Sequence, residues 1–349
     1  MGATDIPSAV RLWLPAAVAA LAVSALVTGG VLAAARRWQV LDRPNARSAH
    51  RDPTPTLGGI GVLAGLWCGL ALLAGTAGVA LEWRALAAGT VALSPLIVDD
   101  LRRPLRVSQK LILQLLAAAA WLALGPRLEI VSLPWLGSLP LGWWSWPVTG
   151  LWLVGVMNVF NFMDGIDGLT ATQTIACGLG LALALAAVQS PAAPLGLLIA
   201  AAAAGFLVFN RPPARIFMGD VGAHAIGLVM GGLAVAGQGH GLPFWLAAAI
   251  LGTYLFDTTY TLARRALRRE NVLQAHSQHL YQRLTRRGWS HGRIDALVLA
   301  LDAGLVAGAI LVGEGRPAGY LWLAGAASCL AGGAAWLEHL DRRDRGRAR

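Results

Sequence analysis

Charged side chains are scarce in this chain of 349 residues, because Asp, Glu, Lys and Arg together make up only 13% of it. Soluble globular proteins carry about 25% charged residues, so the composition argues against a soluble domain. Hydrophobic residues reach 56% instead. The alternating apolar and polar pattern of membrane β-strands is also absent. The sequence therefore predicts a helical integral membrane protein.

Other scarce features exclude further classes of protein. Cys68, Cys177 and Cys329 are the only cysteines, and each lies in a hydrophobic segment without a paired spacing. This pattern indicates neither a disulfide framework nor a thiolate metal site, so we interpret them as small buried residues. No soluble basic domain is present, which argues against a nucleic-acid partner. Only Arg11 precedes the first apolar run and no cleavage motif stands out, so we expect a retained span.

Long hydrophobic runs dominate the rest of the chain. A helix needs about 20 apolar residues to cross the roughly 30 Å hydrocarbon core. The segments that approach this length are 12–35, 57–79, 83–98, 109–125, 148–163, 168–189, 194–210, 220–237, 243–263, 294–313 and 318–338. Because 83–98 is short for a span, we predict ten or eleven transmembrane helices. Together they form one all-α, polytopic catalytic domain over residues 1–349.

The distribution of basic residues predicts the orientation of these spans. Of the 28 Lys and Arg residues, 24 fall in five connecting segments, namely 36–56, 99–110, 211–217, 264–293 and 342–349. All five lie on one side if every span crosses once. Basic loops stay on the cytoplasmic side, so we predict an outside N-terminus and a cytoplasmic C-terminus.

Five aspartates lie at span ends on that same side: Asp99, Asp100, Asp164, Asp167 and Asp220. Each has a simpler interpretation, since the pair in "LIVDDLRRP" could cap a helix and "DGIDG" could form an ordinary turn. Adjacent carboxylates at a membrane edge, however, favour a shared cation or proton. We therefore predict one catalytic face, built from the cytoplasmic loops 36–56, 99–108, 164–168, 211–219 and 264–293.

The string "NVFNFMDGIDGL" (158–169) carries the most information. A tight turn does not explain Asn158 and Asn161, which share one face of a helix end. Amides are costly within an apolar span unless they have partners. Asn161, Asp164 and Asp167 then form an arc of oxygen atoms, a ligand type that suits a hard cation such as Mg²⁺.

The string "FMGDVGAH" complements this arc. Asp220 lies between Gly219 and Gly222 at a predicted helix start, where free N–H groups favour an anion. Asn210 could add a polar contact or cap the preceding helix. Lys110, the only lysine, could extend toward the headgroups or contact a phosphate.

The longest predicted cytoplasmic loop contains His276, His279 and Arg283. Two histidines three residues apart, without a third ligand, are a poor zinc site. The surrounding arginines favour contacts with a pyrophosphate or nucleotide.

The order and sidedness of these motifs resemble the polyprenyl-phosphate N-acetylhexosamine-1-phosphate transferases. The resemblance runs from about residue 41 to 290 and rests on "VDD", "NVFNFMDGIDGL", "FMGDVGAH" and the basic His loop. It implies a multi-pass enzyme of the bacterial inner membrane whose active site faces the cytoplasm. The implied partners are undecaprenyl phosphate, a UDP-N-acetylhexosamine and membrane lipid. The resemblance leaves open whether the protein forms a homodimer.

The implied reaction is Mg²⁺-dependent, with Mn²⁺ as a substitute, and gives undecaprenyl-diphospho-sugar and UMP. The resemblance implies Mg²⁺ ligation by Asp220 and Asp164, and positioning of the lipid phosphate by Asp99. The predicted catalytic residues are Asp99, Asp100, Asp164 and Asp167. The predicted substrate-binding residues are Lys110, Asn158, Asn161, Asn210, His276, His279 and Arg283.

One departure from the family concerns the histidine cluster. "HLYQ" places Tyr281 and Gln282 where many members carry histidines, which argues against the peptidoglycan branch. The loop looks more like members that start O-antigen synthesis, some of which use 6-deoxy sugars. Two alternatives are a transporter with acidic relay residues and a lipid-phosphate phosphatase. The acids at one membrane face and the absence of a repeat disfavour the transporter.

Overall fold

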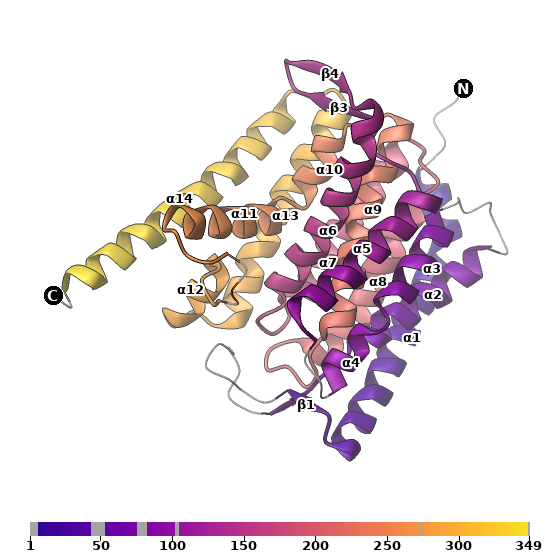
Figure 1. The fold of residues 1–349 in the computed structure, drawn as a ribbon. Coiled ribbons are helices and arrows are strands. Elements are labelled where there is room, and N and C mark those ends of the chain that lie inside the picture. Colours follow the sequence, from indigo (N-terminus) through magenta and orange to yellow (C-terminus); the bar gives the residue numbers. More distant parts are fainter. Residues whose placement is uncertain are drawn as a thin grey trace.

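The fold was analysed in a computed structural model, which describes residues 6–42, 53–74, 82–101, 105–272, 274 and 276–347. Most of these residues are helical (Figure 1). The helices before the "DGIDG" turn are α1 (Ile6–Trp38), α2 (Gly59–Ala74), α3 (Glu82–Leu93), α4 (Leu96–Leu101), α5 (Val107–Leu124) and α6 (Ser145–Met163). The helices after it are α7 (Leu169–Ala187), α8 (Ala193–Asn210), α9 (Asp220–Ala236), α10 (Phe244–Ile250), α11 (Gly252–Leu267), α12 (Leu280–Arg286), α13 (His291–Gly313) and α14 (Ala318–Arg347).

The all-α, polytopic architecture is confirmed. Within the described residues, eight helices are long and apolar enough to cross a membrane, and α2 is a shorter apolar helix. The predicted span 57–79 is described as helix only over Gly59–Ala74, and residues 75–81 lie outside the described part. Two other predicted spans, 83–98 and 243–263, differ because each is divided into two helices.

The first division separates α3 from α4. Pro95 has no backbone N–H to donate, and the hydroxyl of Ser94 donates to the carbonyl of Val91, 2.8 Å away. The interruption leaves a short helix, α4, at one end of the bundle. Asp99 and Asp100 lie in its last turn.

The second division separates α10 from α11 around Leu251. In Figure 1, α11 runs crosswise to the neighbouring helices. A helix start inside a membrane protein leaves N–H groups without partners in the helix, so polar side chains are needed there. The hydroxyl of Thr253 donates to Asp302 of α13 at 2.6 Å and lies 3.1 Å from Gln173 of α7. These three buried residues join α7, α11 and α13 at the break.

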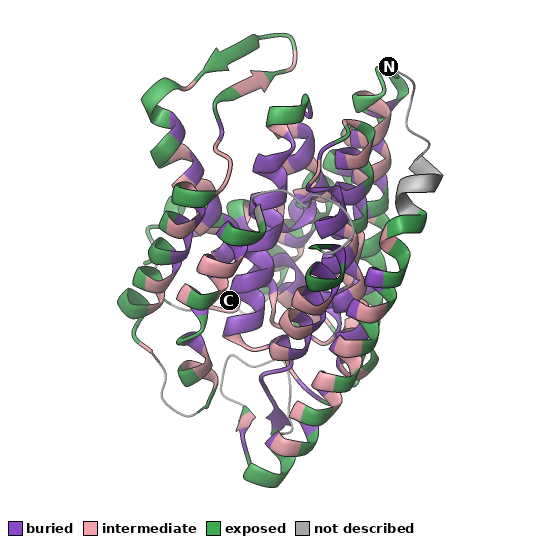
Figure 2. Cartoon of the chain, turned by 90° about the vertical axis from the view of Figure 1, so that its right-hand side faces the viewer, coloured by how far each residue is buried: buried purple, intermediate pink, exposed green. Residues whose placement is uncertain are grey.

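Helix α9 forms the centre of the bundle. Every residue from Val221 to Ala236 is buried, and the buried core of Figure 2 surrounds it. It packs against α2, α3 and α6, among others. The backbones of α2 and α9 meet at Gly59 and Gly222, where a Cβ on Gly59 would lie 2.3 Å from the Cα of Gly222. The start of α9, which carries Asp220, is therefore held by the packing of several helices.

The two ends of the bundle differ in character. Helices α4 and α12 and strand β1 (Leu41–Asp42) lie at the lower end in Figure 1, which we call the site end. There β1 pairs with β2 (Thr54–Pro55), and the carbonyl of Pro55 accepts from the N–H of Phe217 at 2.8 Å. The opposite end carries the start of α1 and the hairpin of β3 (Ile130–Leu133) and β4 (Gly137–Pro140).

The hydroxyl of Thr253 provides a test of the α10–α11 break. Thr253→Val keeps the shape of the side chain but leaves Asp302 and Gln173 without this partner, so we expect a loss of about 1–3 kcal/mol in the free energy of unfolding. Unfolding of the purified protein in mixed detergent micelles measures the change. Thr258→Val is the matched control, because the Thr258 hydroxyl on the same helix is buried and has no hydrogen-bond partner within the described residues. Equal losses in the two variants would contradict this role for Thr253.

Candidate active site

Asp100 caps the start of α9 at the site end. Its Oδ1 accepts from the backbone N–H of Asp220 at 2.9 Å, and its Oδ2 accepts from Val221 at 3.4 Å. Gly219 precedes the helix with φ +81°, and a Cβ there would lie 2.7 Å from Asp100 Oδ2. Only glycine therefore fits at this position. Burial, and next the charge of Asp220, raise the pKa of Asp100 to about 7.

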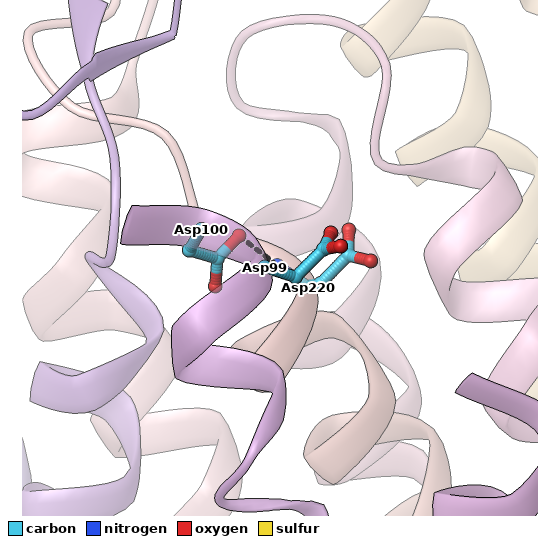
Figure 3. Close-up of side chains that lie close together, drawn as sticks. All are labelled: Asp99, Asp100 and Asp220. Atoms are coloured by element: carbon cyan, nitrogen blue, oxygen red, sulfur yellow. Dashed lines mark hydrogen bonds between the residues drawn. The ribbon is translucent and has the colours of Figure 1, made fainter. Parts of the chain in front are cut away.

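Asp99 and Asp220 face each other across the ammonium of Lys110. The Lys110 Nζ lies 2.6 Å from Asp99 Oδ2 and 2.5 Å from Asp220 Oδ2. Asp99 also accepts from the backbone N–H of Leu105, and Asn161 Nδ2 donates to Asp220 Oδ1 at 3.0 Å. In Figure 3 the carboxylates of Asp99 and Asp220 point in the same direction, whereas the Asp100 carboxylate turns to the backbone N–H of Asp220.

These three carboxylates fit a hard divalent cation. Asp99, Asp100 and Asp220 each offer an oxygen, and these oxygens all lie within 4.8 Å of one another. The carboxylates of Asp99 and Asp220 exceed the charge of the Lys110 ammonium by one, and Asp100 adds a further negative charge when it is ionised, so a divalent cation would balance the excess. The donors are oxygens only, which suits Mg²⁺ or Mn²⁺ better than zinc. The motif "VDD" and Asp220 are thus brought together, as the sequence predicted.

Asp164, the other predicted metal ligand, does not belong to this group of three within the described residues. Burial raises its pKa to about 7, the hydroxyl of Thr170 opposes this shift by hydrogen bonding, and the charge of Asp220 adds to it. The carboxyl therefore lies within electrostatic reach of Asp220. Direct ligation of the metal by Asp164 stays a prediction.

The amide of Asn158 is used within the protein. It exchanges hydrogen bonds with Gln114 of α5, at 2.7 Å and 3.2 Å, and also donates to the carbonyl of Val154. Gln114 in turn lies 2.9 Å from His224 Nε2, and His224 Nδ1 lies 2.7 Å from the carbonyl of Asp220. Asn158 thus supports Asp220 through two buried residues that the sequence did not single out. Its predicted contact with substrate is not needed to explain its position.

The "DGIDG" turn is fixed by neighbouring loops. Asp167 Oδ2 accepts from the backbone N–H of Ala214 at 3.1 Å and lies 3.2 Å from His291 Nδ1. Asn210 accepts from the N–H of Gly168 at 3.0 Å and donates to the carbonyl of Ile216 at 2.9 Å. Asn210 is buried and joins the turn to loop 211–219, and its contact with substrate stays a prediction.

The predicted histidine loop lies against the end of α6. His279 is buried, and its Nδ1 lies 3.0 Å from Oδ1 of Asp257 on α11. A carboxylate only accepts, so Nδ1 carries the proton and Nε2 is left for another partner. The rings of His276 and His279 are 5.0 Å apart. Burial, followed by the charges of His279 and Arg265, lowers the pKa of His276 to about 4.

Arg283, predicted to bind substrate, has partners within the protein. Its guanidinium lies 3.2 Å from Glu338 and 2.9 Å from Asp341, both on α14. The side chain is only 3% exposed. These contacts give Arg283 a structural role, and a direct contact with substrate stays untested. Sequence patterns could not reveal the pairing, because its partners lie more than fifty residues away.

Comparison with known proteins decides the family. Residues 83–238 match glycosyl transferase family 4. A probable undecaprenyl-phosphate N-acetylglucosaminyl 1-phosphate transferase of Bacillus subtilis (strain 168) is 31% identical over 271 residues, which cover 75% of this chain and 74% of that protein. The chain belongs to glycosyl transferase family 4. The predicted resemblance is thereby confirmed.

Two further relatives of this family 4 member cover most of the chain. A phospho-N-acetylmuramoyl-pentapeptide-transferase of Synechococcus sp. (strain JA-3-3Ab) is 30% identical, over 81% of this chain and 87% of that protein. A decaprenyl-phosphate N-acetylglucosaminephosphotransferase of Mycobacterium tuberculosis (strain CDC 1551 / Oshkosh) is 29% identical, over 82% and 78%. The chain is therefore a membrane transferase, and the transporter and phosphatase alternatives lose their support.

The lowered pKa of His276 leads to a pH prediction. With a pKa of about 4 instead of 6.5, this imidazole is neutral above about pH 5 and gains its charge only below that. We therefore expect KM for the donor to depend on pH in the same way in His276→Gln and in the unmodified enzyme, between about pH 6 and 8. His240→Gln, at an exposed position after α9, is the control. A step near neutral pH that disappears only in His276→Gln would contradict the assignment.

Proposed function

We propose that this family 4 enzyme transfers a sugar-1-phosphate from a UDP-N-acetylhexosamine to undecaprenyl phosphate and releases UMP. The observation that carries the proposal is the group of three carboxylates, two of them paired with Lys110, at one end of a bundle of apolar helices. A lipid phosphate is anchored at the membrane edge, so its acceptor oxygen can reach such a group without leaving the bilayer. Relatives named for polyprenyl-phosphate transfer support the same reaction class.

Phosphoryl transfer depends on positioning and charge neutralisation more than on a strong base. An oxygen of the lipid phosphate bonds to the β-phosphorus of the donor, the bond from that phosphorus to the bridging oxygen breaks, and UMP leaves with the electron pair. Phosphate oxygens are already ionised near neutral pH, so Asp99 is proposed to orient the acceptor. Lys110 can exchange its carboxylate partners for a phosphate oxygen.

A divalent cation, proposed to be Mg²⁺, fits the same oxygens. Asp220 and Asp99 would hold it, with Asp100 or Asp164 as a further ligand. When bound, it supplies the positive charge that stabilises the pyrophosphate and the leaving UMP. His279 is proposed to contact the donor phosphates through Nε2, while its Nδ1 donates to Asp257. For this contact both ring nitrogens carry a proton, because a phosphate oxygen only accepts. Asp167 and Asn210 keep the "DGIDG" turn in place beside His279.

The proposed setting is the inner membrane of a bacterium, with the site end facing the cytoplasm. Of the 28 Lys and Arg residues, 24 fall in the five segments that the sequence predicts to be cytoplasmic, and cytoplasmic loops carry such an excess. UDP-N-acetylglucosamine is the first donor to test, because two relatives are named for that sugar. The proposal includes a 6-deoxy sugar as the alternative donor, and a role in the synthesis of O-antigen or another envelope polysaccharide.

Release of UMP by purified protein tests this function. With undecaprenyl phosphate and a UDP-N-acetylhexosamine, we expect UMP that requires Mg²⁺ and disappears with EDTA. Asp220→Asn removes one negative oxygen from the cation site and should lower kcat at least about a hundredfold, as expected for a lost interaction with the transferred group.

Glu129→Gln is the control for this experiment, because Glu129 is 73% exposed and lies at the opposite end of the bundle. Elution as a single species in detergent would show that both variants fold. Near-normal activity of Asp220→Asn would remove Asp220 from the site. Inorganic phosphate in place of UMP would overturn the proposed reaction.

A further inference from the structure

The last helix, α14, ends in acidic residues that contact arginines of α11 and α12. Glu338 accepts from Arg264, and it lies 3.0 Å from Arg268 and 3.2 Å from Arg283. The hydroxyl of Tyr260 also donates to Glu338, at 3.1 Å. The carboxylate of Glu338 on α14 thus contacts several donors from two other helices.

Asp341, one turn further along α14, continues this pattern. It accepts from Arg283 at 2.9 Å and from Arg287 at 2.7 Å, and it lies 3.5 Å from Arg264. We call Glu338 and Asp341 the acidic clamp. Figure 1 shows α14 running diagonally along one side of the bundle, past α11 and α12.

Burial makes the acidic clamp more than a surface ion pair. The side chain of Arg283 is 3% exposed, and that of Glu338 is 18% exposed. A guanidinium does not lose its proton in a protein, so burying it without carboxylates would leave an uncompensated charge. Within the described residues, Nε and Nη1 of Arg283 have no hydrogen-bond partner, so Nη2 carries the hydrogen bond to Asp341 and Nη1 contacts Glu338 as an ion pair at 3.2 Å. The position of Arg283 therefore depends on Glu338 and Asp341.

Arg283 belongs to the helix that holds the histidine loop against the site. His279 caps α12, and Asp257 accepts from the N–H groups of Leu280 and Tyr281 at 3.0 Å and 3.3 Å. The first turn of α12 is thus tied to α11, whereas its second turn is tied to α14 through Arg283. Both ties fix the direction in which the His279 ring points.

A second contact joins α12 to the "DGIDG" turn. The hydroxyl of Tyr281 donates to the carbonyl of Phe162 at 3.1 Å. A Cβ on Gly165 would lie 2.1 Å from that hydroxyl, so the tyrosine packs directly on the turn. A shift of α12 would therefore move His279 and disturb the turn that carries Asp164 and Asp167.

We infer that Glu338 and Asp341 are positioning residues of the transfer reaction, which act through Arg283 and α12 on His279. They contact no residue of the three-carboxylate group among the described interactions, and no direct contact with substrate is assigned to them. The C-terminal helix is on this view part of the donor site. The inference rests on the proposed function, in which His279 contacts the donor phosphates.

Isosteric neutral variants test the inference. Glu338→Gln combined with Asp341→Asn keeps the side-chain shapes but removes both charges that balance Arg283. We expect KM for the UDP-sugar to rise about tenfold while kcat changes little, because a contact made equally before and during transfer is weakened. KM for undecaprenyl phosphate should stay unchanged. A merely structural role would lower the amount of folded enzyme and leave both KM values as they are.

The control variant is Asp344→Asn. Asp344 lies on the same helix, is 63% exposed and contacts Arg287 at 2.9 Å, but it has no contact with Arg283 among the described ion pairs. Its kinetic constants should match those of the unmodified enzyme. Asp341→Asn alone serves if the double variant does not fold, since it removes one of the two carboxylates and leaves Glu338 in place.

Hydrogen exchange gives a second readout that does not require activity. We expect faster amide exchange over residues 279–287 in the charge-neutral variants, with unchanged exchange in the centre of α13. An active enzyme whose variants keep the original donor KM and the original exchange in α12 would overturn the inference. If the unmodified protein releases no UMP, the proposed function fails, while the exchange experiment still decides whether the acidic clamp holds α12.

Discussion

Repulsion between carboxylates at the membrane edge is the constraint on which the site depends. Asp99, Asp100 and Asp220 approach within 4.8 Å, and the protein offsets their charge in two different ways. Lys110 places one ammonium between Asp99 and Asp220, while the N–H groups at the start of α9 receive Asp100. The pKa of Asp100 is raised mainly by burial and next by the charge of Asp220, so the neighbouring carboxylate adds to the effect of burial. The remaining negative charge is what makes the site suited to a cation and a phosphorylated substrate.

The surrounding fold serves this arrangement through two interrupted spans. The break before α4 turns Asp99 and Asp100 toward the first turn of α9. The break before α11 lets that helix run crosswise and brings Asp257 to His279. Irregular backbone inside a membrane protein is tolerated only where polar groups satisfy it, and here the Cys177 Sγ donates to the carbonyl of Ile250 at 3.0 Å. Thr253, Gln173 and Asp302 form a buried group of side-chain hydrogen bonds beside this break. The polar residues within the apolar helices thus mark the places where the chain departs from a simple span.

Much of the fold could be predicted because hydrophobic length alone identifies most spans. The grouping of Asp99, Asp100 and Asp220 was also predictable, since all three lie at span ends on one side. The two helix breaks were missed because the mean hydropathy of a segment does not show where a backbone N–H group lacks a partner. Gln114 and Asp257 were missed because a single polar residue in an apolar helix has no local signature, whereas His224 was quoted in "FMGDVGAH" but was given no role. Arg283 found its partners on α14, a pairing between distant segments that only the folded chain shows.

The position of the single lysine has a consequence for chemical labelling. The Lys110 side chain is 27% exposed, and the chain offers no other ε-amine. Any acylation of a lysine would therefore occur at this side chain, and slowly while Asp99 and Asp220 hold it as an ammonium ion. Loss of the ammonium charge would leave Asp99 and Asp220 facing each other without compensation. Modification of Lys110 would thus report on access to the group of three carboxylates.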